Sequence, residues 1–341
     1  KQPSGNQGMF KIDQNASTVN LKDIIFTDGY TTPQPYSLIT AYGANVIVNI
    51  DNCKFINNTC LNGGAIAASH KASVYINNSQ FYNNKAIMIT SEGGAISISD
   101  AYAYVANCEF INNTGCDGGA IYVNYGGILD IVNSTFINNT AIKTTIVIGG
   151  GGAIYTRGTT TIKNSTFINN FADLYGGAIL MAGGDLNVKQ SYFKDNKVGA
   201  EDSMASKAKD IQVQSGVYYY NFNVEYSVFV SSTQEHLFVM HNGNLDYANV
   251  SGEYNYWGSN SQNANTNIKF TNQLIIQAIT QTTPVHEGDN VKINVEFKNR
   301  DVNGVISTLK ENVHEYTLDV SSGLNEICPV VTIANNIGQI D

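Results

Sequence analysis

The sequence predicts an all-β protein: a right-handed parallel β-helix followed by a small β-sandwich. The first observation is a recurring phrase, Phe-Ile-Asn-Asn or a close variant, which is followed five times by Gly-Gly-Ala-Ile. The second is its period. Six phenylalanines that occupy the same slot lie 26, 29, 26, 31 and 26 residues apart: Phe55, Phe81, Phe110, Phe136, Phe167 and Phe193. A period of this length indicates stacked units that bury a core only together.

Each repeat contains short strands in which every second residue is apolar. In the repeat of Phe136, Leu129 and Ile131 alternate with polar residues, and Ser134 and Phe136 alternate again after a bend at Asn133. Alternation of this kind predicts strands with one buried face. Gly-Gly-Ala-Ile opens a third strand, so we expect three strands in each coil and one column of Phe along the rod.

Two further slots support the stacked arrangement. The position two residues before each Phe is always small, and it holds Cys53, Ser79, Cys108, Ser134, Ser165 and Ser191. Paired asparagines follow each Phe strand, and Asn tolerates left-handed backbone while it forms local hydrogen bonds. We interpret these pairs as amide ladders at a corner of the coil.

The repeat becomes weaker towards both ends of the β-helix. Val19 to Phe26 and Phe222 to Phe229 still fit the slots, which gives about eight to nine coils. After them comes Tyr254-Asn255-Tyr256-Trp257-Gly258, with the single Trp of the chain. Because a solenoid needs a covered end, we assign this aromatic cluster to the cap. We therefore place the β-helix at residues 1–262.

Residues 263–341 are predicted to form a linker and an immunoglobulin-like module. A polar stretch from Ser259 to Thr266 reads as the linker. Beyond it three segments alternate in the manner of strands, and Glu287-Gly288-Asp289 and Asn303-Gly304 are typical of turns. The three segments are Leu274 to Ile279, Val291 to Phe297 and Tyr316 to Val320.

Composition excludes several classes of partner. The net charge is −9 and Arg occurs at only two positions, so no basic patch is present for nucleic acid or an anionic membrane. No run of 18 apolar residues occurs, and we expect no membrane insertion by this segment. The chain begins at Lys1 without an apolar signal region, which we interpret as a fragment of a longer secreted or cell-surface protein.

The pairing of Phe-Ile-Asn-Asn with Gly-Gly-Ala-Ile resembles the polymorphic outer membrane protein repeat (FxxN/GGAI) of bacterial surface adhesins and of adhesin-like surface proteins of methanogenic archaea. In the archaeal proteins a β-helix that ends in Asn-Tyr-Trp-Gly and continues into immunoglobulin-like modules is similar to Asn255–Gly258 and residues 275–341 here. The resemblance is strong over about residues 46–200. It implies a β-helix, placement on the cell surface and a role in adhesion, and it names no receptor.

A pectate-lyase-like solenoid also carries polysaccharide lyases and hydrolases, so an enzyme is the first alternative function. Lyases of that kind need clustered carboxylates and a strong base, and inverting hydrolases need two facing carboxylates. The outer face of the Gly-Gly-Ala-Ile strands offers no such pair. Asp117, Asp130, Asp173 and Asp185 occupy different phases of the repeat, as solvated turn residues do. We expect no enzymatic activity and no cofactor.

One group on that face is of interest for binding. Tyr122 and Tyr155 fall in the same slot of adjacent coils, and Asn124 and Arg157 lie beside them. Stacked tyrosines with an Arg and an Asn suit a sugar ring or a peptide. The alternative is packing between coils that only favours strand formation.

Two repeats carry insertions between Asn-Asn and Gly-Gly, at Lys85 to Glu92 and at Thr140 to Gly150. Insertions in a solenoid gather on one face, which is often the binding face. Their apolar residues suggest either a surface for a partner or loops that pack on each other. The candidates are Ile87, Met88, Ile89, Ile146, Val147 and Ile148.

Cysteines and histidines give weaker signals. Spacing allows only Cys53 with Cys60 and Cys108 with Cys116 to pair, and buried thiols remain equally open. His236 lies five residues before His241, which does not match a zinc motif, so we predict no metal site.

The function that we predict is therefore a segment of a cell-surface adhesin, which binds a surface protein or carbohydrate of another cell. A rigid rod would present loops and a flat face, and weak contacts would multiply along the repeats. The alternatives are a passive stalk and a polysaccharide-active lyase or hydrolase.

Overall fold

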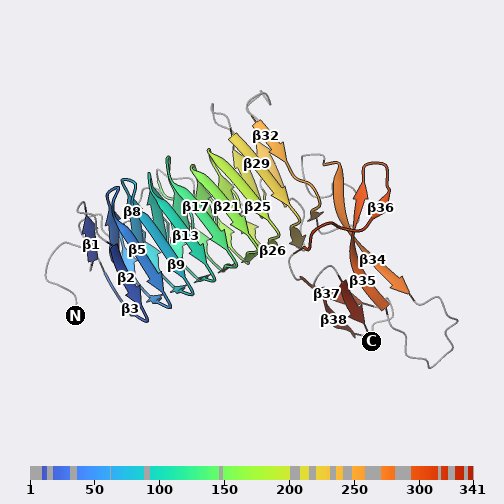
Figure 1. Cartoon of the computed structure of the whole chain (residues 1–341), viewed down its shortest axis with the longest axis horizontal. Helices are drawn as coiled ribbons and strands as arrows, with labels where there is room; N and C mark the ends of the chain where they lie inside the picture. The colour runs from blue at the N-terminus through green and yellow to red at the C-terminus, as the bar shows by residue number, and fades with distance from the viewer. Residues whose placement is uncertain are drawn as a thin grey trace.

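The computed structural model is a right-handed parallel β-solenoid that carries a smaller antiparallel region at its C-terminal end (Figure 1). The structure describes residues 10–13, 18–30, 37–61, 63–87, 93–145, 149–199, 208–214, 220–230, 236–240, 248–257, 270–280, 293–313, 316–321, 327–333 and 337–340. In this part of the chain every regular element is a strand. The described residues also contain no helix that is long and apolar enough to cross a membrane.

The Phe strands form a parallel sheet of nine strands, which we call the Phe sheet. Each strand has three residues or fewer, and equivalent residues pair in register, so Phe81 lies between Phe55 and Phe110. Its strands, in order along the rod, are β3 (Ile25–Thr27), β6 (Lys54–Ile56), β10 (Gln80–Tyr82), β14 (Glu109–Ile111), β18 (Thr135–Ile137), β22 (Thr166–Ile168), β26 (Tyr192–Lys194), β30 (Val228–Val230) and β33 (Tyr256–Trp257).

The strands that precede each Phe form a second sheet of nine, the wide sheet, in which most strands have five residues. Alternate residues point inward and are buried, as Val74 and Ile76 show. The strands are β2 (Thr18–Lys22), β5 (Ile47–Asp51), β9 (Ser73–Asn77), β13 (Tyr102–Ala106), β17 (Ile128–Val132), β21 (Thr159–Lys163), β25 (Asp185–Lys189), β29 (Tyr220–Glu225) and β32 (Ala248–Ser251).

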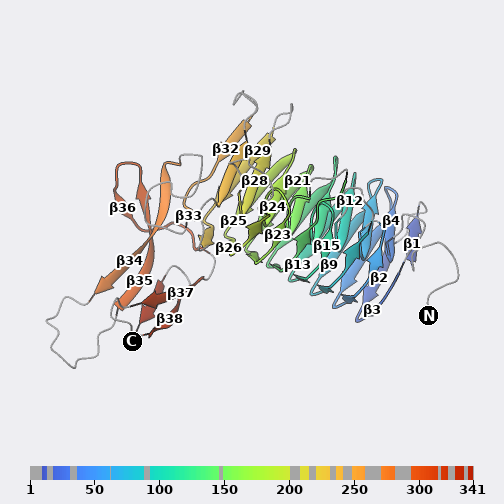
Figure 2. The same cartoon turned by 180° about the vertical axis from the view of Figure 1, so that it is seen from behind.

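The strands that follow Gly-Gly form a third sheet of nine, the Ile sheet. Its inward Ile side chains are buried and pair in register, for example Ile96 with Ile121. The strands are β1 (Phe10–Asp13), β4 (Ile39–Tyr42), β8 (Ile66–Ser69), β12 (Ile96–Ser99), β16 (Ile121–Val123), β20 (Ile154–Thr156), β24 (Ile179–Met181), β28 (Ile211–Gln214) and β31 (Leu237–Met240). Figure 2 shows the Ile sheet from the opposite side.

A fourth sheet was not predicted. The two residues that follow each buried Asn form a short strand. These strands hydrogen-bond to their counterparts in the next coil and together make a six-stranded sheet, which we call the short sheet. The strands are β7 (Thr59–Cys60), β11 (Lys85–Ala86), β15 (Thr114–Gly115), β19 (Thr140–Ala141), β23 (Phe171–Ala172) and β27 (Lys197–Val198). The prediction of three strands in each coil was therefore wrong for these coils, because a strand of two residues is too short to show alternation.

The Phe column is the centre of the core. Successive rings from Phe26 to Phe229 stack with centroids 4.6 to 4.8 Å apart and planes within 9° of parallel. Each of the six repeat phenylalanines is completely buried. Burial of one such ring is worth about 1.5 to 3 kcal/mol, so the column supplies much of the free energy that holds the coils together.

The predicted asparagine ladder is confirmed. The first Asn of each pair has positive φ, as at Asn138 with φ 55°, and turns the chain. The second is completely buried. Asn139 donates to the carbonyl of Phe110 at 2.9 Å and accepts the backbone N–H of Asn113 at 3.0 Å. The ladder satisfies buried polar groups that would otherwise be costly.

Trp257, in the aromatic cluster that was predicted to cap the solenoid, extends the Phe column. Its ring stacks on Phe229 at 4.5 Å and so continues the Phe column. Phe270 then stacks on Trp257 at 5.7 Å and covers the end of the column. Because the cap uses the same stacking as the coils, the solenoid ends without an exposed aromatic core.

The C-terminal region forms two antiparallel sheets. The larger contains β34 (Asn272–Thr280), β35 (Ile293–Asp301), β36 (Ile306–Ser307) and β39 (Ile337–Ile340), and the smaller pairs β37 (Tyr316–Ser321) with β38 (Ile327–Ile333). The strands expected at Leu274–Ile279 and Tyr316–Val320 are present. An immunoglobulin-like sandwich stays a prediction, as does the domain boundary.

This region packs on the outer side of the Phe sheet. Leu274, Val295 and Phe297 share one buried cluster with Tyr226 and Tyr256 of the solenoid. Polar contacts surround the cluster. One of them is the ion pair between Lys189 and Glu311, whose charged atoms are 2.9 Å apart.

Candidate functional site

The predicted pair of tyrosines on the Ile sheet is brought together as expected. Tyr122 of β16 is in register with Tyr155 of β20, and their ring centroids are 5.4 Å apart. Both side chains point out of the Phe-lined core, yet Tyr122 is only 5% exposed and Tyr155 only 1%. They form a small outer cluster with Leu180, so this part of the face is filled by packing between coils.

The outer cluster also contains a buried carboxylate. Asp117 is 2% exposed and accepts the backbone N–H of Gly150 at 3.3 Å. Burial raises the pKa of Tyr155, and the negative charge of Asp117 adds to that effect. The interpretation of Asp117 as a solvated turn residue was therefore wrong. The carboxylate of Asp117 is tolerated in this buried position because it accepts the backbone N–H of Gly150.

Arg157 connects this cluster to the surface. Its guanidinium lies 5.1 Å from the ring centroid of Tyr155 and 5.6 Å from that of Tyr125. Tyr125 is 57% exposed. Such cation–π contacts orient the guanidinium and leave an aromatic and a cationic group together at the surface. We call Tyr125 and Arg157 the turn pair.

Asn124 supports the turn pair. Its Oδ1 accepts the backbone N–H of Tyr125 at 2.9 Å, and its side chain is half-buried. Of the four predicted residues, Asn124 and Arg157 thus reach the surface, whereas Tyr122 and Tyr155 are buried. Tyr125 was not predicted, because it lies in a turn, outside the alternating pattern that identified the others.

The insertions are described only in part. Ile87 is half-buried, and its backbone N–H donates to the carbonyl of Cys60 at 3.0 Å. The other five candidates, Met88, Ile89, Ile146, Val147 and Ile148, lie outside the described residues. That the apolar residues of the insertions form a surface for a partner, or pack on each other, stays a prediction.

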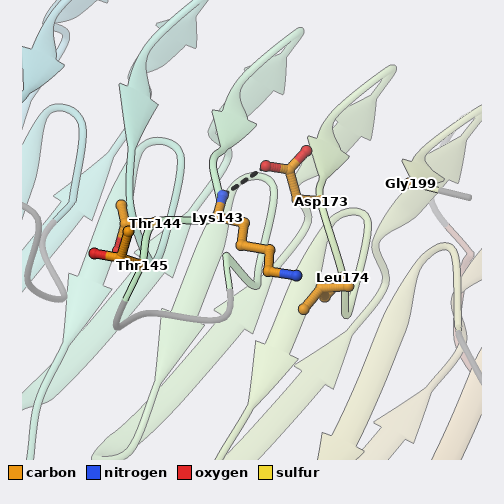
Figure 3. Close-up of a pocket in the computed structure, with 6 residues that line it drawn as sticks. All are labelled: Lys143, Thr144, Thr145, Asp173, Leu174 and Gly199. Atoms are coloured by element: carbon orange, nitrogen blue, oxygen red, sulfur yellow. Dashed lines mark hydrogen bonds between the residues drawn. The ribbon is translucent and has the colours of Figure 1, made fainter. Parts of the chain in front are cut away.

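A surface hollow of about 650 Å³ lies beside the second insertion (Figure 3). Three of its six lining residues, Lys143 to Thr145, belong to the segment Thr140–Gly150. The others are Asp173, Leu174 and Gly199. The backbone N–H of Lys143 donates to the carboxylate of Asp173 at 2.5 Å, which joins two adjacent coils. Leu174, 6% exposed, adds an apolar wall to an otherwise polar hollow.

The cysteines of the solenoid and His236 are buried. Cys53, Cys60, Cys108 and Cys116 are buried thiols, and none of the four is in a disulfide. His236 is completely buried, and its Nδ1 lies 2.5 Å from the carboxylate of Asp210. Within the described residues, no three His, Cys, Asp or Glu side chains come together as metal ligands. His241 lies outside the described residues.

Comparison with known protein families identifies the repeat. Four segments match the Chlamydia polymorphic membrane protein repeat: residues 78–99, 107–124, 133–157 and 164–181. They cover strands of the Phe, short and Ile sheets, and the strands of the wide sheet lie between them. The predicted resemblance to this repeat family is therefore confirmed, while its archaeal part stays a prediction.

The chain is also similar to one characterised eukaryotic protein. It is 39% identical over 87 residues to metabotropic glutamate receptor-like protein R of Dictyostelium discoideum. The match includes 25% of this chain and 5% of that protein. The chain thus spans a small part of the length of this relative.

Proposed function

We propose that this chain is the rod segment of a cell-surface adhesin, and that it binds a surface protein or carbohydrate of another cell. The observation that supports the proposal most is the match of four coils to the Chlamydia polymorphic membrane protein repeat. The family points to an outer membrane or cell-surface location. Secretion, glycan binding and the identity of the partner are the finer parts of the proposal.

The structure supports this proposal in two ways. Continuous Phe and Asn columns make a stiff rod, which holds surface groups at fixed distances from each other. The turn pair and the hollow at Lys143 and Asp173 both lie outside the ladders, so neither is needed to close the core. Groups that the fold does not need are available for a partner.

Whole-cell binding by the purified chain tests the proposal. The chain would be coupled to fluorescent beads and offered to a panel of bacterial, archaeal and protozoan cells. We expect bound beads on at least one cell type, and weaker binding after Arg157→Ala or Asp173→Ala. Lys163→Ala, at an exposed lysine of the wide sheet, serves as the control. Unchanged binding by both site variants would disprove the role of these two sites.

A passive stalk is the second candidate function. The observation that favours it is the burial of Tyr122 and Tyr155, which removes the most aromatic part of the predicted binding face. A stalk predicts that beads carrying this chain bind no cell type above the level of uncoated beads. In that case the repeats would serve to hold other parts of a longer protein away from the surface.

We further propose that the chain binds without catalysis. One carboxylate that an enzyme would need free is used within the fold, because buried Asp117 accepts a backbone N–H. The test is incubation with a broad panel of polysaccharides. Release of reducing ends or unsaturated sugars would overturn this part of the proposal.

A further inference from the structure

The outer face of the wide sheet carries a group of tyrosines that the repeat does not require. Tyr75 of β9 is in register with Tyr104 of β13, and Tyr102 lies two residues before Tyr104 on the same face. Tyr75 is 36% exposed, and the other two are half-buried. The residues between them, such as Ala103, point inward and are buried. We call Tyr75, Tyr102 and Tyr104 the tyrosine platform.

The platform and its neighbours on the same face form two rows that run across four coils. One row is Asn49, Tyr75, Tyr104 and Asp130, and the other is Ile47, Ser73, Tyr102 and Ile128. The isoleucines at the two ends of the second row are 37% and 44% exposed. An exposed aromatic and apolar patch with polar residues at its border is typical of an interaction site.

Contacts within the platform fix the rings before any ligand arrives. The rings of Tyr75 and Tyr102 meet edge to face, with centroids 5.7 Å apart and planes at 64°. The hydroxyl of Tyr102 donates to Oδ2 of Asp130 at 2.9 Å. A carboxylate has about four acceptor sites, and this bond uses one of them. Asp130 can therefore accept further hydroxyl groups beside the rings.

The chemistry of the eight positions favours a carbohydrate. The C–H face of a pyranose packs on the face of an aromatic ring, while sugar hydroxyls donate to carboxylate and amide oxygens. The rows contain Asp130 and no Lys or Arg, so they repel an acidic polymer. A flat sheet face also lacks the deep pocket that anchors a protein side chain. A linear chain of sugars meets a new position of the row at every coil, about 4.8 Å apart.

We propose that the tyrosine platform, with Asn49 and Asp130 at its ends, binds an uncharged polysaccharide. This inference rests on the proposed adhesin function and names the ligand of its flat face. A linear glycan crosses the strands of β5, β9, β13 and β17 and stacks on the tyrosines, and Asp130 accepts its hydroxyls. The turn pair and the hollow lie outside the two rows and are not part of this site.

Affinity electrophoresis of the whole chain in gels that contain one polysaccharide each tests the proposal. The uncharged probes are mannan, xylan and a mixed-linkage glucan, and polygalacturonate is the acidic probe. We expect retardation by at least one uncharged polymer and none by polygalacturonate. In Tyr75→Thr/Tyr104→Thr the affinity falls by about tenfold, because two stacking faces are lost while the strand propensity of the residues is kept.

Further variants separate binding from folding. Tyr102→Phe keeps the ring but loses the bond to Asp130, and Asp130→Asn removes the charge; we expect each to weaken binding by less than the double variant. Tyr30→Thr removes a tyrosine that is 49% exposed away from the rows, and it should bind like the parent chain. Thermal unfolding of each variant shows that the solenoid is intact.

Three outcomes would overturn the inference. They are no retardation by any uncharged polymer, equal retardation of the parent and the double variant, and a dimer in sedimentation experiments that the double variant abolishes. Such a dimer would mean that a second copy of this chain, and not a polysaccharide, covers the tyrosine platform. Beads that bind cells, together with no retardation by any uncharged polymer, would leave the adhesin function standing while this inference fails. Retardation without any cell binding would do the reverse.

Discussion

Trp257 stacks on Phe229 with centroids 4.5 Å apart and planes at 16°, so the last turn of the solenoid continues the column that the repeat phenylalanines build. The indole is 1% exposed, since Phe270 covers its other face. Trp257 lies outside the repeat, and its ring therefore connects the Phe column to Phe270 at the end of the solenoid. Stability at this end of the rod depends on it.

Removal of this ring tests the cap. We expect Trp257→Ala to lower the free energy of unfolding by about 3 to 5 kcal/mol, because it leaves a cavity between two aromatic rings. Urea denaturation followed by circular dichroism measures the change. The control is Tyr125→Ala, at a side chain that is 57% exposed, with an expected cost of about 1 kcal/mol or less. Equal costs for the two variants would contradict the assignment of the cap.

The asparagine ladder gives a second prediction, with a control in the neighbouring residue. Asn139→Ala removes bonds to Phe110, Asn113 and Asn170 inside the core, and we expect a loss of about 3 kcal/mol. Asn138→Gly changes an exposed residue whose φ of 55° suits glycine, and we expect a change of about 0.5 kcal/mol or less. Chemical denaturation compares the two, and similar losses would show that the ladder is not what stabilises the corner.

The thiols give a third prediction. Cys108 occupies the slot that holds Ser in other coils, and its Sγ donates to the carbonyl of Ala106 at 3.1 Å, as Ser134 does to Val132. We expect Cys108→Ser to change stability by about 1 kcal/mol or less and Cys108→Val to cost more, because Val has no donor. Thermal unfolding measures both. A valine variant as stable as the serine variant would mean that this hydrogen bond contributes little.

Burial also raises the pKa of the Cys108 thiol to about 12. The thiolate is the reactive form, so we expect Cys108 to resist a thiol reagent at neutral pH until the chain unfolds. Mass spectrometry after labelling of the native and the urea-unfolded protein measures this. Rapid modification of Cys108 in the native protein would argue against a closed core at this coil.

Alkaline titration gives a fifth prediction. Burial and a hydrogen bond to a carboxylate raise the pKa of Tyr82 and of Tyr102 to about 12, and the acceptors are Glu109 and Asp130. Because the folded pKa lies above the ordinary value of about 10, these groups stabilise the fold below pH 10. That contribution is lost as pH rises towards 12. Ultraviolet absorption of the phenolate measures the ionisation.

The substitutions Tyr82→Phe and Tyr102→Phe provide the control for this titration. Each variant should lack one phenolate that forms late in the pH range, and its stability should depend less on pH above 10 than that of the parent. Ionisation of all tyrosines at their ordinary pKa would contradict the two hydrogen bonds.

Much of the fold could be read from the sequence, because one repeated residue type decided each column. Phe55, Asn58 and Ile66 occupy slots whose neighbours in the next coil are the same residue or a similar one, so stacking in register follows from the repeat itself. The short sheet could not be read in this way. Strands of two residues, such as Thr59–Cys60, carry no periodicity.

The candidate site was less predictable than the fold. The sequence paired Tyr122 with Tyr155, which the register confirms, but it gave no sign that packing with Leu180 would bury both rings. Tyr125 and the hollow at Lys143 and Asp173 depend on how turns of different coils meet, and no repeat governs those turns. The tyrosines of the platform appear in only two coils, so no repeated slot marks them.

The sequence by itself determined a parallel solenoid with Phe, Ile and Asn columns and an aromatic end, because each of these features repeats a local preference at a fixed spacing. Only the tertiary structure decided which outward residues meet water. Outward Tyr155 is buried and outward Tyr75 is exposed, although both alternate with core residues on their strands. The difference arises because Tyr155 packs in a cluster with Tyr122 and Leu180, whereas Tyr75 lies on the open face of the wide sheet.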